Sequence, residues 1–416
     1  MRKLKLLLAA NLISTVGTGI TSYLIVWLLI DQLKQSVLYG LLTMATMILV
    51  FFASPYLGSL VDRYSRKAIF LYMEITGIVV LGVFSVLCNV SAVLDITLVV
   101  MLIFYHTAYD SIKYPALAAL TQEMFKKEDY SKVNSSLEVQ GQAALMISSG
   151  LAAMMIGKMD AAVILVMNIS TFIAASILIY QLPYQRNAEA EEHSNTMKNE
   201  SYWKNFRSSL QYLCYRKVLF VLLLTSFIPS IVIIVANYLD PVFIYDYLNE
   251  GPSVIGIANI VYAIGAMGAG FVAYQISKKW SDMQGVILFM AVFALATIAI
   301  FLVPNAVTFI VASLFWGHSN AAIRVFRKSY MFHHVDNAYM GRVNSLFNAV
   351  KLLGQVALIG ILTITVVPAG QTVYGYFVLF IIVIAALLTT TYLTELITKI
   401  KKSGYLYRVA SPVEEA

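Results

Sequence analysis

The sequence predicts an all-α membrane protein with twelve transmembrane helices arranged as two bundles of six. Of the 416 residues, 60% are hydrophobic and only 12% are charged, whereas a soluble domain carries about 25% charged residues. The apolar residues form runs of about 20, which is the length at which a helix crosses a hydrocarbon core of ~30 Å. Lysine and arginine also alternate between successive connections, as they do in multi-pass membrane proteins.

Helices are the expected form of these runs because lipid offers no hydrogen-bond partners to an extended backbone. The first run follows Arg2, Lys3 and Lys5. It has the length of a full span and lacks a small-residue cleavage site, so we expect a first span and no cleaved signal peptide. The expected spans are residues 6–30, 37–57, 68–90, 93–122, 133–157, 161–183, 217–247, 252–276, 284–304, 305–332, 342–366 and 369–396.

The basic residues predict the topology. Of 29 lysines and arginines, 25 fall in connections on one side of the expected spans. The opposite connections hold only Lys34 and Lys158, while Lys113 and Lys351 fall within spans. By the positive-inside rule we expect a multi-pass protein of the plasma (inner) membrane with both termini in the cytoplasm. The net charge of +7 reflects this topology, so no nucleic-acid partner is needed to explain it.

One long connection divides the spans six and six. We expect an N-terminal six-helix bundle at 1–183, a cytoplasmic linker at 184–216, a C-terminal six-helix bundle at 217–396 and a cytoplasmic tail at 397–416. The linker opens with a polar run and continues with apolar residues at helical spacing, which is typical of a helix lying at the lipid interface. These apolar residues are Trp203, Phe206, Leu210 and Leu213.

A weak internal repeat accompanies this division. The fifth span contains Val-Asn-Ser at 133–135 and Gly-Gln-Ala-Ala-Leu at 141–145, and the eleventh contains Val-Asn-Ser at 343–345 and Gly-Gln-Val-Ala-Leu at 354–358. Two related halves of the same orientation would place such a repeat in the fifth and eleventh spans. This arrangement is typical of a recurrent class of secondary transporters.

The connection between the second and third spans carries the most specific motif. It reads Gly58-Ser-Leu-Val-Asp62-Arg63-Tyr-Ser-Arg66-Lys67. This resembles the Gly-x-Leu-Ala-Asp-Arg-x-Gly-Arg-Lys signature of the major facilitator superfamily, in the same loop. The resemblance implies the major facilitator fold and a gating role for the motif, in which Asp62 makes a helix-end or ion-pair contact between the halves that differs between two states.

Further segments resemble the macrolide-efflux and siderophore-exporter branch of this superfamily, which comprises bacterial drug:proton antiporters. They are Ser14–Thr21 in the first span, Tyr114-Pro-Ala with Ala119-Leu in the fourth, Ser170-Thr-Phe in the sixth and Gly341-Arg-Val before the eleventh. One feature departs from the antiporter pattern. The fifth span keeps Gly141, Gly150 and Gly157 but lacks the proline of the family's Gly-Pro pair.

Three ionisable residues in the fourth span are the first candidates for a functional site, because charge within a span is costly and marks function. His106, Asp110 and Lys113 share one helix face at spacings of i, i+4 and i+7. Either the charges of Asp110 and Lys113 neutralise one another, or Asp110 accepts a proton. In the second case His106 would assist, since histidine is the side chain that changes charge near physiological pH.

The expected depth of the other ionisable residues in the membrane predicts their roles. Lys351 in the eleventh span is expected to pair with an acid such as Asp110 or Glu138, or to meet an anionic substrate. Glu74 and Glu138 are expected at solvated helix ends near the inner surface. Arg324, Arg327 and Lys328 are expected at an inner helix end, and Asp240 before Pro241 marks either a helix break or an outer gate.

Aromatic and small residues complete the candidates. A cavity for apolar solutes is expected to be lined by some of Tyr23, Trp27, Tyr105, Tyr109 and Trp316, although each is more often a packing residue. Gly265, Gly268 and Gly270 lie at lipid depth, so they predict close helix packing and no nucleotide loop.

From these features we expect a secondary transporter that exports a hydrophobic or amphipathic small molecule, macrolide-like or siderophore-like, in exchange for protons. Uptake, or transport of a lipid-related substrate, is a second hypothesis, and a non-transporting membrane sensor is a third. No metal-spaced histidine pair, nucleophile motif or Walker motif is present, so neither an enzyme nor an ATP-driven pump is expected. We expect no cofactor and no metal, a proton gradient as energy source, and a functional monomer in the lipid bilayer.

Overall fold

The computed structural model describes residues 2–90, 96–126, 129–184, 211, 213 and 215–402. Within these residues the chain forms twelve long α-helices, which confirms the predicted fold class. The first six are α1 (Arg2–Trp27), α2 (Ser36–Arg63), α3 (Arg66–Val90), α4 (Ile96–Met124), α5 (Tyr130–Met155) and α6 (Ala161–Tyr180). The second six are α9 (Lys217–Val242), α10 (Pro252–Ser277), α11 (Asp282–Leu302), α12 (Ala306–His334), α13 (Asn337–Thr365) and α14 (Val373–Lys402).

The helices extend past several of the predicted spans because a helix continues beyond the apolar run until a capping or turn signal ends it. Helix α14 runs into the predicted tail at 397–416, and α2 continues to Arg63. The starts of α11 and α12 carry the expected caps: Ser281 forms a capping box with Gln284, and the Asn305 side chain accepts a hydrogen bond from the backbone N–H of Thr308. Most of the predicted linker at 184–216 lies outside the described residues.

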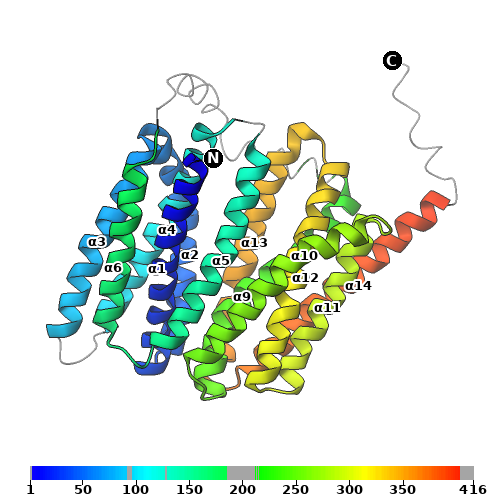
Figure 1. Cartoon of the computed structure of the whole chain (residues 1–416). Helices are drawn as coiled ribbons and strands as arrows, with labels where there is room; N and C mark the ends of the chain where they lie inside the picture. The colour runs from blue at the N-terminus through cyan, green and yellow to red at the C-terminus, as the bar shows by residue number, and fades with distance from the viewer. Residues whose placement is uncertain are drawn as a thin grey trace.

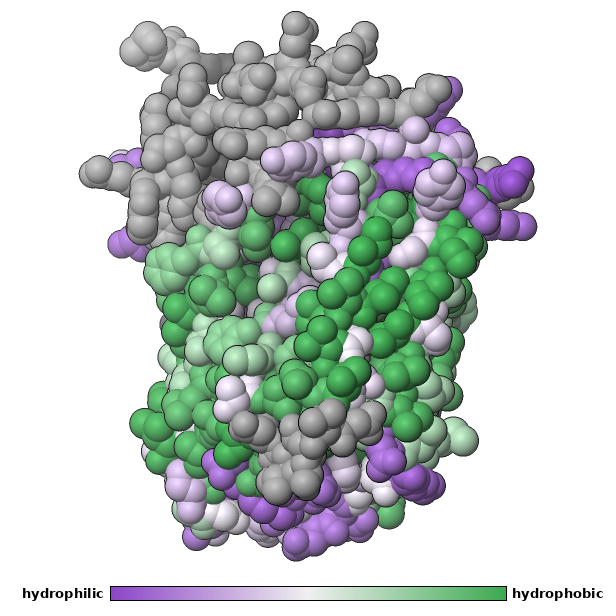
Figure 2. All heavy atoms as spheres, turned by 90° about the vertical axis from the view of Figure 1, so that its left-hand side faces the viewer, coloured by the Kyte–Doolittle hydropathy of each residue, from purple (hydrophilic) through white to green (hydrophobic). Residues whose placement is uncertain are grey.

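Figure 1 shows the first six helices side by side with the second six, with the start of α1 and the end of α14 on the same side of the bundle. We call this the terminal side and the other the opposite side. On the face shown in Figure 2, hydrophobic residues form a belt across the middle, and hydrophilic residues lie at the two ends of the molecule. This distribution fits a protein whose middle contacts lipid chains and whose ends contact water.

The two halves repeat an unusual local feature. Helix α1 ends in a π-helical turn, η1 (Leu28–Gln32), and α9 ends in η3 (Phe243–Tyr247). Each turn is followed by a non-glycine residue with φ of 54°, Lys34 in the first half and Asn249 in the second. Because α9 continues through Pro241 into η3, the helix break considered at Asp240 does not occur.

Ten of the described helices are long and apolar enough to be recognised as spans by composition alone. The two that are not are α4 and α5. Helix α4 contains His106, Asp110 and Lys113, and α5 contains Glu138 and Gln142. These polar residues are enclosed by neighbouring helices or face a cavity, so the two helices with the weakest membrane signal contribute to the candidate site.

Candidate functional site

Two connected chambers lie between the halves of the bundle. The chamber on the terminal side has a volume of about 900 Å³, and the central chamber has a volume of about 620 Å³. Both are lined by Gln142, Ile233, Ile234, Asn320 and Arg324. They therefore form one continuous space that begins at the terminal side and extends past the middle of the bundle.

The opposite end of this space is closed by contacts between the halves. The Ser36 hydroxyl of α2 donates a hydrogen bond to Asp246 of η3. The rings of Tyr39 and Tyr238 are 5.4 Å apart, and Thr363 of α13 donates to the Tyr238 hydroxyl at 2.8 Å. On the terminal side, Glu138 and Arg324 are 3.7 Å apart. Because 63% and 45% of these two side chains are exposed, the space reaches the surface there.

His106 and Asp110 of α4 lie in the wall of the central chamber. His106 Nδ1 is 3.6 Å from Asp110 Oδ2, and His106 Nε2 is 3.1 Å from the carbonyl oxygen of Thr18 in α1. Tyr114, one turn further along α4, lines the same chamber. His106 and Asp110 therefore lie side by side, as their shared helix face predicts, and they face a cavity. The role of Asp110 as a proton acceptor stays a prediction.

Lys113 does not share this arrangement. Its side chain is 2% exposed, and its Nζ donates hydrogen bonds to Ser14 Oγ at 2.8 Å and to Thr15 Oγ1 at 3.3 Å, both in α1. No hydrogen bond or ion pair joins Asp110 to Lys113 among the described residues, so their direct pairing is not formed, although the two groups attract each other electrostatically. Lys113 instead points into the interface between helices.

The buried acid that accompanies Lys113 is Glu74 of α3. Glu74 is fully buried, and its Oε1 accepts hydrogen bonds from Ser14 Oγ at 2.8 Å and from the Tyr109 hydroxyl at 2.9 Å. Ser14 thereby bridges the carboxylate and the ammonium group. The prediction that Glu74 lies at a solvated helix end is wrong, because α3 is packed between α4 and α6 at this depth.

Cationic side chains line the chamber on the terminal side, and they come from the C-terminal half. Arg327 of α12 is 8% exposed, and its Nη1 donates to the Ser226 carbonyl oxygen at 2.9 Å and to Ser230 Oγ at 3.3 Å. Its guanidinium carbon lies 3.8 Å from the centroid of the Phe227 ring. Arg327 is therefore part of the cavity wall, and its expected place at an inner helix end is corrected.

Three further cations line the same chamber: Arg324, Lys328 and Lys351. Glu138 of α5 is the acidic residue among the described lining side chains, and its ion-pair partner is Arg324. Among the described residues no acid lies within ion-pairing distance of Lys351, so the predicted pairing of Lys351 with Asp110 or Glu138 is not formed. The prediction that Lys351 meets an anionic substrate remains open.

Some of the five aromatic candidates line the space between the halves. These are Tyr23 and Trp316, in the wall of the central chamber. Trp27, Tyr105 and Tyr109 are not among the described lining residues of either chamber and have packing roles. Trp27 and Tyr105 pack against a hydrophobic cluster of the first half, and Tyr109 is buried beside Glu74.

The gating motif is described only in part. Gly58, Asp62 and Arg63 belong to α2, but their side chains lie outside the described residues, so the predicted contact of Asp62 between the halves is untested. Arg66 forms an ion pair with Glu123 of α4. Lys67 Nζ donates to the carbonyl oxygens of Tyr180 and Leu182, both at 2.8 Å. Arg66 and Lys67 thus connect elements within the first half.

Sequence reasoning missed Arg327 as a cavity residue, together with the lining amides Gln142 and Asn320. The sequence does contain a pattern that places Arg327 on a cavity-facing surface. It lies a full turn or more inside the end of α12, which closes at His334, and it is spaced by three from Arg324 and by seven from Asn320. That stripe of polar residues on one face of an apolar helix predicts a cavity-facing surface.

The chain is similar in sequence to distant relatives. Macrolide efflux protein A of Enterococcus faecalis is 23% identical over 305 residues, which are 72% of this chain and 92% of that protein. A protein of the same name from Streptococcus pyogenes is 21% identical over 264 residues, covering 63% of this chain and 64% of the relative. These similarities confirm the expected resemblance to the macrolide-efflux branch.

Solved structures show the same fold. A bacterial homologue of the iron transporter ferroportin in an inward-facing state superposes with a TM-score of 0.71 at 14% identity, covering 94% of this chain and 98% of that one. A D-xylose–proton symporter gives a TM-score of 0.69 at 11% identity, covering 93% and 96%.

A sequence profile described as Major Facilitator Superfamily matches residues 7–359. That stretch contains the lining helices α4, α5, α9, α10 and α12 in full, together with most of α1 and of α13. The twelve-helix bundle, the space between its halves and this match lead to one conclusion: the chain belongs to the Major Facilitator Superfamily and is a membrane transporter rather than an enzyme.

Proposed function

We propose that this transporter exports hydrophobic or amphipathic small molecules, macrolide-like or siderophore-like, in exchange for protons by alternating access. The observation that carries the proposal is the continuous space between the halves, closed at the opposite side and open at the terminal side, with His106 and Asp110 in its wall. The names of the two distant relatives support efflux as the direction.

The terminal side is the cytoplasmic side in this proposal, and the membrane is the plasma membrane. The support is the concentration of lysine and arginine in the connections on that side. With this orientation the structure is open to the cytoplasm, so a solute can enter from inside the cell or from the inner leaflet. The proton gradient supplies the energy, no cofactor is required, and one chain is the working unit.

Asp110 is the proposed proton acceptor. The titratable and charged groups around it are Tyr105, His106, Lys113 and Tyr114 on its own helix and Arg324 of α12 in the wall of the same chamber. In the state open to the outside, Asp110 takes up a proton. In the state open to the cytoplasm it releases that proton into the chamber, beside His106.

The test uses purified protein in sealed liposomes with an imposed pH gradient and a fluorescent amphipathic solute. We expect solute movement against its own gradient with wild-type protein, and an Asp110→Asn variant in which gradient-driven movement falls at least about tenfold, because the proton acceptor is absent. Exchange of solute without a pH gradient should continue in this variant, since alternation does not require Asp110.

The matched control is Asp160→Asn, because Asp160 is an exposed residue before α6 whose side chain makes no capping hydrogen bond. It should transport like wild type. Undiminished gradient-driven transport by Asp110→Asn would exclude Asp110 as the proton acceptor. If wild-type protein moved no amphipathic solute under any proton gradient, the export proposal itself would be wrong.

A further inference from the structure

The terminal-side chamber has an unusual charge balance. Among the described lining side chains, four are cationic, namely Arg324, Arg327, Lys328 and Lys351, and one, Glu138, carries a carboxylate. Arg324 and Arg327 are the charged neighbours of Lys351. Cations gathered at membrane depth repel one another and lose hydration, so such a cluster destabilises the empty protein unless an anion compensates it.

Arg327 is held in one orientation by the surrounding structure. Its Nη1 donates to Ser226 and Ser230, and its guanidinium plane lies over Phe227. The Phe227 ring stacks on Phe347 of α13, with centroids 4.9 Å apart and planes inclined by 9°. Arg327 Nη2 forms no hydrogen bond or ion pair with a described residue. A rigid guanidinium with an unused edge is suited to bind a carboxylate, phosphate or sulfonate through paired hydrogen bonds.

The contact between Glu138 and Arg324 does not neutralise the cluster. At 3.7 Å and with both side chains largely exposed, it is a solvated pair of the kind that contributes little. An acidic group that enters the chamber can therefore replace Glu138 as the partner of Arg324 while also approaching Arg327 and Lys351.

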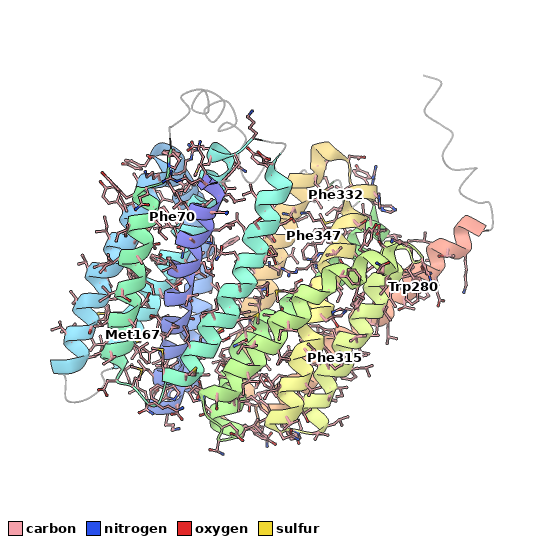
Figure 3. All side chains as sticks on the ribbon, in the orientation of Figure 1. Phe70, Met167, Trp280, Phe315, Phe332 and Phe347 are labelled. Atoms are coloured by element: carbon pink, nitrogen blue, oxygen red, sulfur yellow. The ribbon has the colours of Figure 1, made fainter. Side chains whose placement is uncertain are left out.

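The remaining wall of the chamber is partly polar, with amides such as Gln142 and Asn320, and partly apolar. Ile233 and Ile234 of α9 and Met331, Phe332 and Met340 line it, and Figure 3 labels Phe332 and Phe347 in the terminal-side half of the C-terminal bundle. A Cβ added at Gly270 of α10, which lines this chamber, would meet no atom within 4 Å. The chamber therefore offers space beside α10 for the apolar part of a ligand.

We propose that the terminal-side chamber binds amphipathic anions: molecules with one acidic group, held by Arg327, Lys351 and Arg324, and an apolar portion that lies against Phe332 and the neighbouring aliphatic side chains. This inference rests on the proposed function and narrows its substrate class. It favours acidic amphiphiles over neutral or cationic compounds, because the cluster repels a cation and gains nothing from an uncharged head group.

The experiment is a binding titration with three fluorescent probes that share an apolar portion. They are 11-(dansylamino)undecanoic acid, its methyl ester, and the dansylamino-undecyl-trimethylammonium ion. Purified protein in a non-ionic detergent should bind the acid at least about tenfold more tightly than the ester and the ammonium ion, the ratio expected from one or two charge-assisted hydrogen bonds. Binding needs no proton gradient.

The variants assign the binding to the cluster. Lys351→Gln and Arg327→Gln should each weaken binding of the acid about tenfold and leave the ester unchanged, while Lys351→Arg retains the preference for the acid. Lys278→Gln, which removes a surface cation at the end of α10, is the matched control and should bind like wild type. Lys351 is only half-buried and makes no hydrogen bond with a described residue, so its variant remains informative even if Arg327→Gln unfolds.

The outcomes separate this inference from the proposed function. Equal binding of acid and ester, preferential binding of the ammonium ion, or undiminished acid binding by Lys351→Gln would overturn the proposed substrate class. Proton-driven export of a cationic solute alongside such a result would leave the function standing. Tight, cluster-dependent binding of the acid without proton-driven export would instead uphold the substrate class and reject the coupling.

Discussion

Lys113 and Lys351 both lie within transmembrane helices, one in each half of the bundle, and their surroundings are opposite. Lys113 is enclosed between α1, α3 and α4, where Ser14 links it to the carboxylate of Glu74. Lys351 lines an open chamber among other cations. A charged residue within a span therefore has two explanations. The charge of Lys113 is compensated by the carboxylate of Glu74, and the charge of Lys351 would be compensated by the proposed anionic ligand.

Polar side chains connect helices in both halves. Asn168 Nδ2 of α6 donates to Thr21 of α1 at 2.7 Å, and Thr390 of α14 donates to Thr225 of α9 at 2.7 Å. The C-terminal half adds a close backbone approach: a Cβ added to Gly317 of α12 would lie 2.0 Å from the backbone carbonyl oxygen of Tyr262 in α10. Small residues permit such an approach.

The largest expected effect concerns the compensated lysine. Lys113→Ala leaves Glu74 buried without its counter-charge, so we expect a loss of about 3–5 kcal/mol in the free energy of unfolding. Lys351→Ala should change it by less than about 1 kcal/mol, since no buried partner is left behind. Unfolding of both variants in the same detergent measures the difference.

A double variant provides the control for this contrast. Glu74→Gln combined with Lys113→Met removes both charges and should recover a large part of the lost stability. If Lys113→Ala were no less stable than Lys351→Ala, the distinction between a compensated and an uncompensated lysine would not hold.

The next effect tests how each half packs. Gly317→Ala should destabilise the protein by about 1–3 kcal/mol, because the added methyl group meets the backbone of α10. Gly17→Ala meets the side chains of Thr171 and Asn168 instead, which can rotate, so its effect should be smaller. Thermal unfolding of the two variants compares them directly, and a larger effect at Gly17 would contradict the assignment.

A smaller effect concerns the contact that joins the halves. Ser36→Ala removes the hydrogen bond to Asp246 on the opposite side, which should shift the balance toward the state open on that side by about 1 kcal/mol, or roughly fivefold. Spin labels at Lys158→Cys and Glu250→Cys, in a chain whose native cysteines are replaced by serine, report the distance between the halves. An unchanged distance distribution would argue against Ser36 as part of the closure.

The smallest effect involves the only acid found in the described wall of the terminal-side chamber. Glu138→Gln removes an exposed ion pair, so stability should change by about 0.5 kcal/mol or less. Affinity for the acidic probe should rise about twofold to threefold, since one repulsive charge is lost. Weaker binding of the acid in this variant would mean that Glu138 helps to hold the ligand, contrary to the charge comparison between the halves.

Contacts between residues of one helix could be predicted from the sequence, whereas contacts between residues of different helices could not. The proximity of His106 and Asp110 follows from their spacing of four residues on one helix. Glu74 was placed wrongly because its partners Ser14 and Tyr109 lie on other helices. Arg327 was assigned to a helix end, although Ser226 and Phe227 of α9 hold it within the wall.

The sequence by itself determined the membrane class, the helices and the family, because each depends on information within one segment: apolar length, charge in the connections, or a loop motif. The tertiary structure alone decided which ionisable groups are compensated and which face the cavity. The rotation of each helix, and its neighbours at a given depth, arise from contacts between segments that are far apart in the chain. The same residue type therefore stabilises the bundle at Lys113 and lines the proposed anion site at Lys351.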